Sequence, residues 1–132
     1  MLAFPFPDAL EVARLSVEEQ EEYATALGLP GPAAEVVAQA AFAQLGLIGF
    51  LTTGSDEVRA WPIRAGDTAR EAAGAIHSDI QRGFIRAEVV SFEDFMSHGS
   101  NMKTCRDAGV LRVEGKDYIV ADGDIVNFRF NV

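Results

Sequence analysis

Two histidines and one cysteine are the residues of this sequence whose types most readily carry catalysis. His77 is followed directly by Ser78 and Asp79, so a base, a hydroxyl and a carboxylate stand side by side. A histidine that acts as a general base needs a cleft and an orienting partner, whereas a cation near a helix C-terminus is favoured without any function. We therefore interpret His77 as a structural residue, and a small enzyme that uses His77 is the less favoured alternative.

The other candidates for chemistry carry weaker signals. His98 stands in a glycine- and serine-rich stretch with no second ligand nearby, and we expect it to be solvated. Cys105 is the only cysteine, which excludes an internal disulfide and a zinc site of paired cysteines, and we expect a half-buried thiol. Residues 109–117 ("GVLRVEGKD") place five residues between two glycines where a phosphate-binding loop has four. The sequence therefore predicts no catalytic, metal or cofactor site in this chain.

A set of basic residues is the more informative feature. Alternation along the expected strands predicts that Arg59, Arg86 and Arg129 point away from the core on one face of a sheet. The apolar residues expected in the core beside them are Val58, Ala87, Val89, Phe128 and Phe130. Three guanidinium groups on one face are suited to docking phosphate or carboxylate groups. The candidate RNA- or protein-contacting residues are Arg59, Arg82, Arg86, Lys116 and Arg129.

Cross-strand ion pairing is the competing interpretation of these arginines. Glu57 and Glu88 lie on the same expected strands and would neutralise them. We weight this interpretation slightly above docking, because exposed ion pairs are common and contribute little energy.

The first third of the chain predicts two helices. Ser16 and Glu19 form a capping box, acidic residues fill the first turn, and Gly28 is suited to end the helix. Gly31 and Pro32 then open a second helix, whose apolar residues recur at helical spacing up to Gly46. A helical hairpin is therefore expected over residues 1–46.

The period changes after residue 46. A β-hairpin is expected over 47–64, with Pro62 indicating an edge strand. Thr68 and Glu71 form a second capping box, which opens one helix that Gly83 can close. The remaining expected elements are a strand over 85–90, short helical turns over 92–95 and 101–108, and short strands over 110–113, 118–120 and 125–130. A hairpin, a helix, a strand and a closing hairpin predict an α+β fold of the β-grasp type over residues 47–132.

The charge is acidic overall and unevenly distributed. The formal net charge is −9, and residues 1–53 hold seven acids against one base, whereas residues 54–132 hold thirteen acids against ten bases. This balance excludes a uniformly basic nucleic-acid-binding face and restricts such contacts to a local patch in the second part. No apolar run approaches the length of a membrane span, and the start "MLAFPFP" lacks a basic leader, so we expect a cytoplasmic protein without membrane contact.

Two long stretches resemble a known family. The stretches are "EVRAWPIRAGDTAREAAGAIHSDIQRGFIRAEVVSFEDF" and "AGVLRVEGKDYIVADGDIVNFRFNV", and their most specific parts are "IHSD", "RGFIRAEV", "VEGKDY", "DGD" and "FRFNV". They closely resemble the C-terminal TGS domain, a ubiquitin-like β-grasp domain, of the YchF family of Obg-like GTP-binding proteins and ATPases. The helical stretch before them resembles the segment that follows the G domain of that family.

This resemblance implies a role for the chain but no catalytic residue within it. In the family, the loop that binds ATP or GTP with Mg²⁺ lies in the G domain, and the chain has no such motif. The TGS domain is regarded as a regulatory module of a ribosome-associated factor that contacts RNA or protein. The expected partners are therefore the ribosome and the G domain. An intramolecular regulator of that G domain, or a module for self-association through the apolar stripe of residues 36–45, is the alternative.

Overall fold

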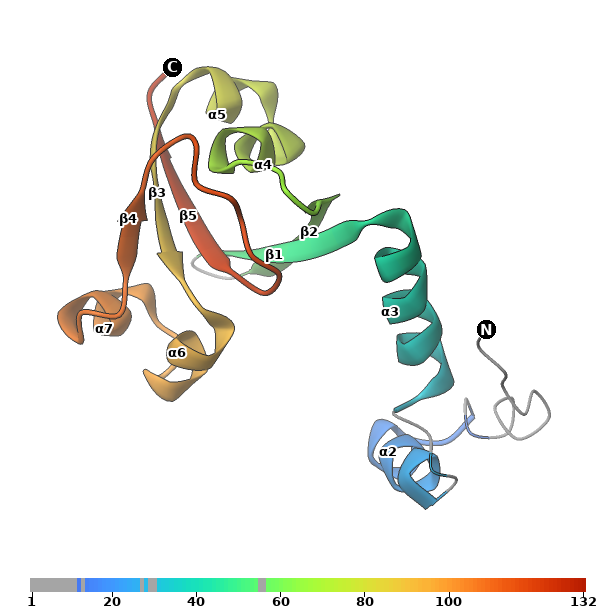
Figure 1. The fold of residues 1–132 in the computed structure, drawn as a ribbon. Coiled ribbons are helices and arrows are strands. Elements are labelled where there is room, and N and C mark those ends of the chain that lie inside the picture. The colour runs from blue at the N-terminus through green and yellow to red at the C-terminus, as the bar shows by residue number, and fades with distance from the viewer. Residues whose placement is uncertain (1–11, 13, 27, 29–30, 55–56) are drawn as a thin grey trace. The chain divides into compact units, whose positions relative to one another are not determined.

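The computed structural model describes residue 12 and residues 14–26, 28, 31–54 and 57–132 (Figure 1). The chain divides into two compact units, residues 1–45 and residues 46–132. Two sequence-based expectations fall outside the described residues. They concern the absence of a basic leader at residues 1–7 and most of the turn expected at 54–56.

The N-terminal unit contains helices α2 (Val17–Ala26) and α3 (Ala33–Leu45). The predicted capping box is confirmed: the backbone N–H of Ser16 donates to Glu19 at 3.0 Å, and the N–H of Glu19 donates to the Ser16 hydroxyl at 3.4 Å. These hydrogen bonds to Ser16 lower the pKa of the Glu19 carboxyl. Gly28 and Gly46 follow the two helices with φ of +68° and +65°, a left-handed conformation that suits glycine after a helix end.

The C-terminal unit is built on a five-stranded mixed sheet. Its strands are β1 (Leu47–Thr53), β2 (Val58–Arg64), β3 (Phe84–Val90), β4 (Arg112–Glu114) and β5 (Ile125–Phe130), in the order β2-β1-β5-β3-β4. The central pair β1 and β5 is parallel, and every other neighbouring pair is antiparallel. Pro62 lies on β2 at one edge, as predicted, because its missing N–H would leave a gap in an interior strand.

The helices of this unit are α4 (Ala69–Ile76), α5 (Ser78–Arg82), α6 (Phe92–Ser97) and α7 (Met102–Asp107). They lie in two groups, α4 with α5 beside the sheet and α6 with α7 near one end of β3 and β4 (Figure 1). One core cluster joins α4 to Phe50, Ala87, Val89 and Phe128, and the rings of Phe50 and Phe128 pack edge to face with centroids 5.9 Å apart. A second cluster joins Phe95 of α6 and Cys105 of α7 to Val90 and Ile125.

The second cluster corrects the prediction that β3 buries one face only. Val89 and Val90 are consecutive and both fully buried, one in each cluster. Because successive side chains of a strand point to opposite faces, this requires cover on both sides. The cover is supplied by α6 and α7, which the sequence predicts only as short turns.

The expected helix over 68–83 is two helices. His77 has extended backbone, with φ −163° and ψ 143°, and is both the residue that ends α4 and the residue that precedes α5. The capping box of Thr68 and Glu71 at the start of α4 is confirmed. The apolar stripe that predicts one helix is real, because Ile76 and Ile80 both pack against the first core cluster. It continues across the extended residue His77, where a periodic pattern does not reveal that the helix is interrupted.

Two smaller predictions are also corrected. Residues 118–120 form no strand, and only Ile119 makes an isolated bridge, with Thr68. Val58 and Phe130, expected in the core, are exposed. Both residues lie at the ends of their strands.

Candidate docking site

The predicted row of three sheet arginines is not one row. Arg59 pairs in register with Thr52 on β1 and stacks over the ring of Trp61, with its Cζ 4.3 Å from the ring centroid. Trp61 packs against the cluster that contains α4, so Arg59 lies on the α4 side of the sheet. The alternation was assigned in the wrong phase for β2, because Val58 was counted as a core residue although it is 65% exposed.

Arg86 and Arg129 do lie together. They are directly opposite each other in the antiparallel pair of β3 and β5, just past a register shift between Phe84 and Arg86. Their neighbours Ala87 and Phe128 face α4, so both arginines lie on the opposite face.

A buried carboxylate stands between these arginines. Glu88 is only 4% exposed, and its Oε2 accepts hydrogen bonds from Arg129 at 3.2 Å and from Arg106 at 3.0 Å. Arg86 approaches Oε1 of the same carboxylate at 3.9 Å. Ion pairing with Glu88 is therefore confirmed, whereas among the described residues Glu57 makes no ion pair with any arginine. The group of Arg86, Arg106, Arg129 and Glu88 is called the Glu88 cluster below.

Arg106 is the member of the Glu88 cluster that sequence reasoning missed. It belongs to α7 and reaches the sheet because the preceding residue, Cys105, is anchored in the second core cluster. Burial, and then the nearby charge of Asp94, raise the pKa of the Cys105 thiol, which is fully buried and not half-buried as expected. The sequence signal that could have indicated Arg106 is its position directly after Cys105, a residue suited to burial, in a short expected helix.

The Glu88 cluster carries an excess of positive charge. Three guanidinium groups face one carboxylate, so two positive charges stay uncompensated within it. The side chains of Arg86, Arg106 and Arg129 are 52%, 51% and 47% exposed. The Nη2 atom of each contacts the Glu88 carboxylate. Such an arrangement is suited to binding oxyanions, because guanidinium groups form charge-assisted hydrogen bonds with carboxylate and phosphate oxygens.

The other two predicted contact residues lie elsewhere. Arg82 stands at the end of α5 and pairs with Asp79, with Nη2 2.7 Å from Oδ1. Lys116 follows β4 and lines a polar hollow of about 410 Å³ with Thr68, Arg70, Glu71, Gln81 and Asp117. The five predicted residues therefore occupy several places, and the structure brings together only Arg86 and Arg129.

The two histidines have structural roles. The Nδ1 of His77 accepts the N–H of Asp79 at 3.1 Å, which caps the start of α5. The expectation that His77 lies near a helix C-terminus as a favoured cation is therefore incomplete, since at the start of α5 a ring nitrogen accepts a backbone hydrogen bond. His98, expected to be solvated, is half-buried, and its ring Nδ1 donates to the carbonyl of Asp94 at 2.6 Å at the end of α6.

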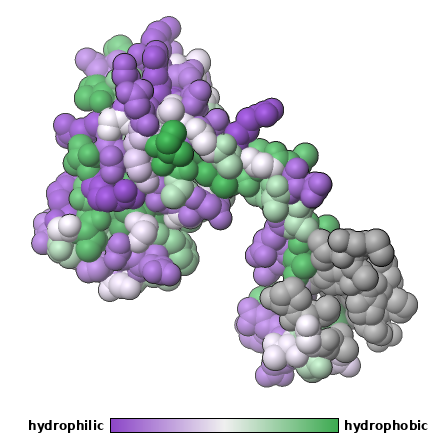
Figure 2. Space-filling view, in the orientation of Figure 1, coloured by the Kyte–Doolittle hydropathy of each residue, from purple (hydrophilic) through white to green (hydrophobic). Residues whose placement is uncertain are grey.

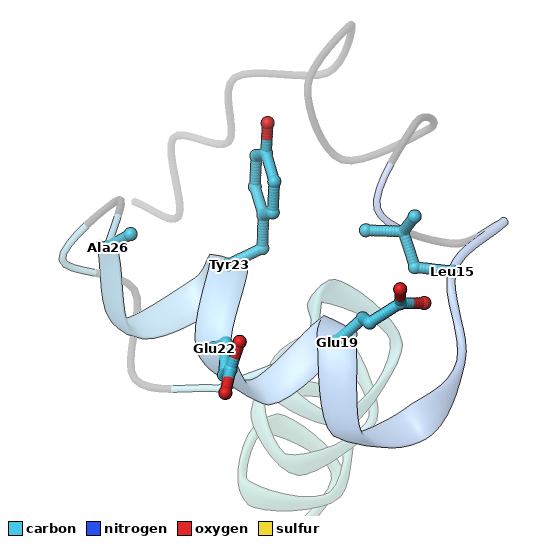
Figure 3. A pocket seen from close by; sticks show the side chains of 5 residues that line it. All are labelled: Leu15, Glu19, Glu22, Tyr23 and Ala26. Atoms are coloured by element: carbon cyan, nitrogen blue, oxygen red, sulfur yellow. The ribbon is translucent and has the colours of Figure 1, made fainter.

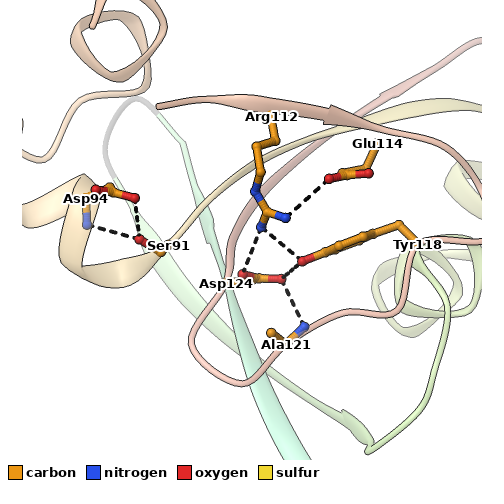
Figure 4. A network of polar contacts seen from close by, with 7 residues as sticks. All are labelled: Ser91, Asp94, Arg112, Glu114, Tyr118, Ala121 and Asp124. Atoms are coloured by element: carbon orange, nitrogen blue, oxygen red, sulfur yellow. Dashed lines mark hydrogen bonds and ion pairs between the residues drawn. The ribbon is translucent and has the colours of Figure 1, made fainter. Parts of the chain in front are cut away.

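A second polar network holds the segment before β5 to β4 (Figure 4). Asp124 is buried and accepts from the Tyr118 hydroxyl at 2.7 Å and from the N–H of Ala121 at 2.9 Å. Arg112 donates to the Tyr118 oxygen at 3.0 Å and pairs with Glu114 at 3.2 Å. Burial, and next the hydrogen bond to Asp124, raise the pKa of Tyr118. Each member is bonded to at least one other member, so we interpret the network as a structural clamp.

The remaining described surface offers little that resembles a catalytic centre. A hollow in the N-terminal unit is lined by Leu15, Glu19, Glu22, Tyr23 and Ala26 (Figure 3). Its Glu19 is already bound to Ser16. Over the described residues, no three histidine, cysteine or acidic side chains are grouped as metal ligands, and no helix has the length and apolar character that crossing a membrane requires.

The chain is similar to proteins of one family. Residues 47–131 match the family model YchF-GTPase_C, described as "Protein of unknown function (DUF933)". The Ribosome-binding ATPase YchF of Escherichia coli O157:H7 is 48% identical over 122 residues, which are 92% of this chain and 33% of that protein. Obg-like ATPase 1 of Homo sapiens is 47% identical over 132 residues, which are 98% of this chain and 33% of that protein.

A solved structure gives the same result. The Schizosaccharomyces pombe YchF GTPase superposes with a TM-score of 0.73 at 31% identity, over 90% of this chain and 31% of that chain. The chain thus spans about a third of the length of the curated relatives it matches.

Proposed function

Because the chain belongs to the YchF family, as the C-terminal part of a GTPase or ATPase of that family, we propose that it is a non-catalytic module that docks on the ribosome through Arg86, Arg106 and Arg129. The observation that carries this proposal is the Glu88 cluster, which concentrates half-exposed positive charge on the sheet face opposite α4 in an acidic chain. The relative from Escherichia coli O157:H7 is named a ribosome-binding ATPase, which supports the choice of partner.

The proposed fold of this module is the β-grasp, in the form of a TGS domain. The sheet has one parallel pair, β1 with β5, and three antiparallel pairs, and α4, which follows β2 and precedes β3 in the chain, packs on one face. Residues 47–132 are proposed to be this domain. Residues 1–46 are proposed to be a helical segment that belongs to the end of the G domain or to its linker, since α2 and α3 are its described elements.

The nucleotide chemistry is proposed to lie outside this chain. Residues 109–117, the only stretch that resembles a phosphate-binding loop, run through strand β4 and the turn after it, not from a strand into a helix. ATP or GTP with Mg²⁺ would then bind in the G domain of the parent protein, which would work in the cytoplasm.

Ribosome co-sedimentation tests the docking proposal. The double variant Arg86→Ala/Arg129→Ala removes two guanidinium groups and leaves Arg106 to neutralise Glu88, so the fold is expected to persist. Binding should weaken, and if both arginines contact phosphates, the slope of log affinity against log salt should fall by about 2.

A matched control separates this site from charge in general. Arg59→Ala/Arg82→Ala removes the same charge from two other places on the C-terminal unit and should bind like the unaltered chain. Equal weakening in both double variants would show that the Glu88 cluster has no special role.

A second candidate function rests on helix α3. Val37 and Leu45 of this helix are exposed apolar residues, and hydrophobic surface follows the helix in Figure 2. Such a surface is suited to contact the G domain or a second copy of the chain. Light scattering on the chain tests this alternative: a dimer that Val37→Ser/Leu45→Ser dissociates would support self-association, and a monomer at all concentrations would exclude it.

A further inference from the structure

The Glu88 cluster has the architecture of a ligand site as well as a charged surface. Its three guanidinium groups come from β3, α7 and β5, and they converge on one carboxylate that is more than nine-tenths buried. Side chains from three separate elements meet at one point only if the fold holds them there. Scattered surface arginines, such as Arg82 with its partner three residues away, have no such arrangement.

The contacts with Glu88 use only part of each guanidinium group. Arg86, Arg106 and Arg129 all approach the carboxylate through the same terminal nitrogen, Nη2. Among the described residues, Nη1 and Nε of these three arginines make no hydrogen bond. Each arginine side chain is about half exposed, so these nitrogens provide donors toward solvent.

We propose that the Glu88 cluster is a binding site for one dianionic phosphate group, as in inorganic phosphate or a phosphate monoester. This inference goes beyond docking, since it assigns a small-ligand site to the same surface and does not require the ribosome. Two uncompensated positive charges match two negative charges. Donors from three elements match a tetrahedral group with three free oxygens, whereas a planar carboxylate is satisfied by a single guanidinium fork.

Glu88 acts in this site as a positioning residue. Its buried carboxylate holds the guanidinium groups in place when no ligand is bound, and its negative charge limits how tightly a phosphate binds. Glu88→Gln keeps the size of the side chain and removes the charge. We therefore expect Glu88→Gln to bind inorganic phosphate about tenfold more tightly, because the variant lacks the negative charge that repels the phosphate.

Nuclear magnetic resonance of the arginine side chains tests this proposal on the full chain. Inorganic phosphate is titrated at pH 8, where it is mainly a dianion, and dimethyl phosphate serves as the monoanionic comparison. The Nε–H signals of Arg86, Arg106 and Arg129 should shift together in a saturable manner with inorganic phosphate. Dimethyl phosphate should bind about tenfold more weakly.

The variants used for docking complete the test. Arg86→Ala/Arg129→Ala should lose about tenfold or more in phosphate affinity, and Arg59→Ala/Arg82→Ala should lose none. The proposal is overturned if the three signals do not saturate, if dimethyl phosphate binds equally well, or if both double variants behave alike. The signal shifts of the unaltered chain decide the matter even if a variant fails to fold.

The outcomes also separate this site from ribosome docking. Phosphate binding without any effect of the same arginines on co-sedimentation would support the small-ligand site and refute docking there. Co-sedimentation that depends on these arginines, without saturable phosphate binding, would support ribosome docking and refute the small-ligand site.

Discussion

The guanidinium of Arg106 donates to the buried carboxylate of Glu88 across 3.0 Å and thereby ties helix α7 to strand β3. The two residues are 18 positions apart in the chain. This contact completes the only group of three cations around one carboxylate among the described residues. Its consequences for stability, and those of three other local features, are open to measurement.

Replacing Arg106 should destabilise the fold measurably. Arg106→Ala removes the shortest of the three contacts to Glu88 and leaves the buried carboxylate with Arg129 as its remaining hydrogen-bond donor. The free energy of unfolding should fall by about 1–2 kcal/mol, because a buried charged group loses a partner that is itself half exposed. Urea unfolding measures this change. Lys103→Ala on the same helix removes an exposed base without an ion pair among the described residues and should have little effect.

Gly83 should not tolerate even a methyl group. A Cβ at this position would overlap the carbonyl oxygen of Asn131, whose N–H donates to the carbonyl of Gly83 at 2.9 Å. The glycine is thus required by the close approach of the backbone after β5, since its φ of −89° is open to any residue. Gly83→Ala should cost about 1–3 kcal/mol of stability. Gly115→Ala, which has nothing within 4 Å of its Cβ, is the control in the same thermal unfolding series.

His77 should be replaceable by another capping residue. His77→Ala removes the acceptor for the N–H of Asp79 and should cost about 1 kcal/mol, whereas His77→Asn retains an acceptor and should cost little. Thermal unfolding of both variants checks this order. Release of phosphate from ATP is measured in parallel. Turnover by the chain that disappears in His77→Asn would instead identify a catalytic histidine.

Tyr118 should make the fold sensitive to alkaline pH. Burial first, and then the hydrogen bond to Asp124, raise the pKa of Tyr118 in the folded state above its ordinary value of about 10. A raised folded-state pKa means that the stabilisation is fully present below about pH 10 and is lost as the pH rises through the folded value. The free energy of unfolding should therefore decrease above pH 10, and decrease less in Tyr118→Phe.

Two features of the chain sharpen the Tyr118 experiment. The only other tyrosine, Tyr23, is exposed and gives an internal reference for tyrosinate absorbance. Cys105, whose pKa burial also raises, is replaced by Ala in both proteins so that its thiol does not contribute. A Tyr118 that titrates together with Tyr23 would contradict the prediction.

Local signals predicted the ends of elements well. The pairs Ser16 with Glu19 and Thr68 with Glu71 mark the starts of α2 and α4, because a capping box depends on residues three positions apart. Alternation likewise predicted the extent of β5 over residues 125–130. The resemblance to the YchF family, carried by the stretches quoted above, was predicted from the sequence and is confirmed by the match over residues 47–131.

Local signals did not predict which of the alternating side chains of a strand face the core, nor which helices pack on each face of the sheet. Arg59 was assigned to the wrong face because alternation states only that neighbours differ, not which of them is buried, and a single exposed valine at a strand end reversed the choice. One unbroken helix was expected past His77 because the apolar spacing continues across the extended residue that separates α4 from α5.

By itself, the sequence determined the family, the caps of two helices and the strand hairpin at 47–64, and it favoured slightly the pairing of Arg86 and Arg129 with Glu88, since each depends on neighbours along the chain or on adjacent strands. Only the tertiary structure decided that α6 and α7 cover Val90 and Ile125 on the second face of the sheet and bring Arg106 to the same carboxylate. Contacts between elements far apart in sequence arise from the packing of the whole unit, and no local pattern specifies them.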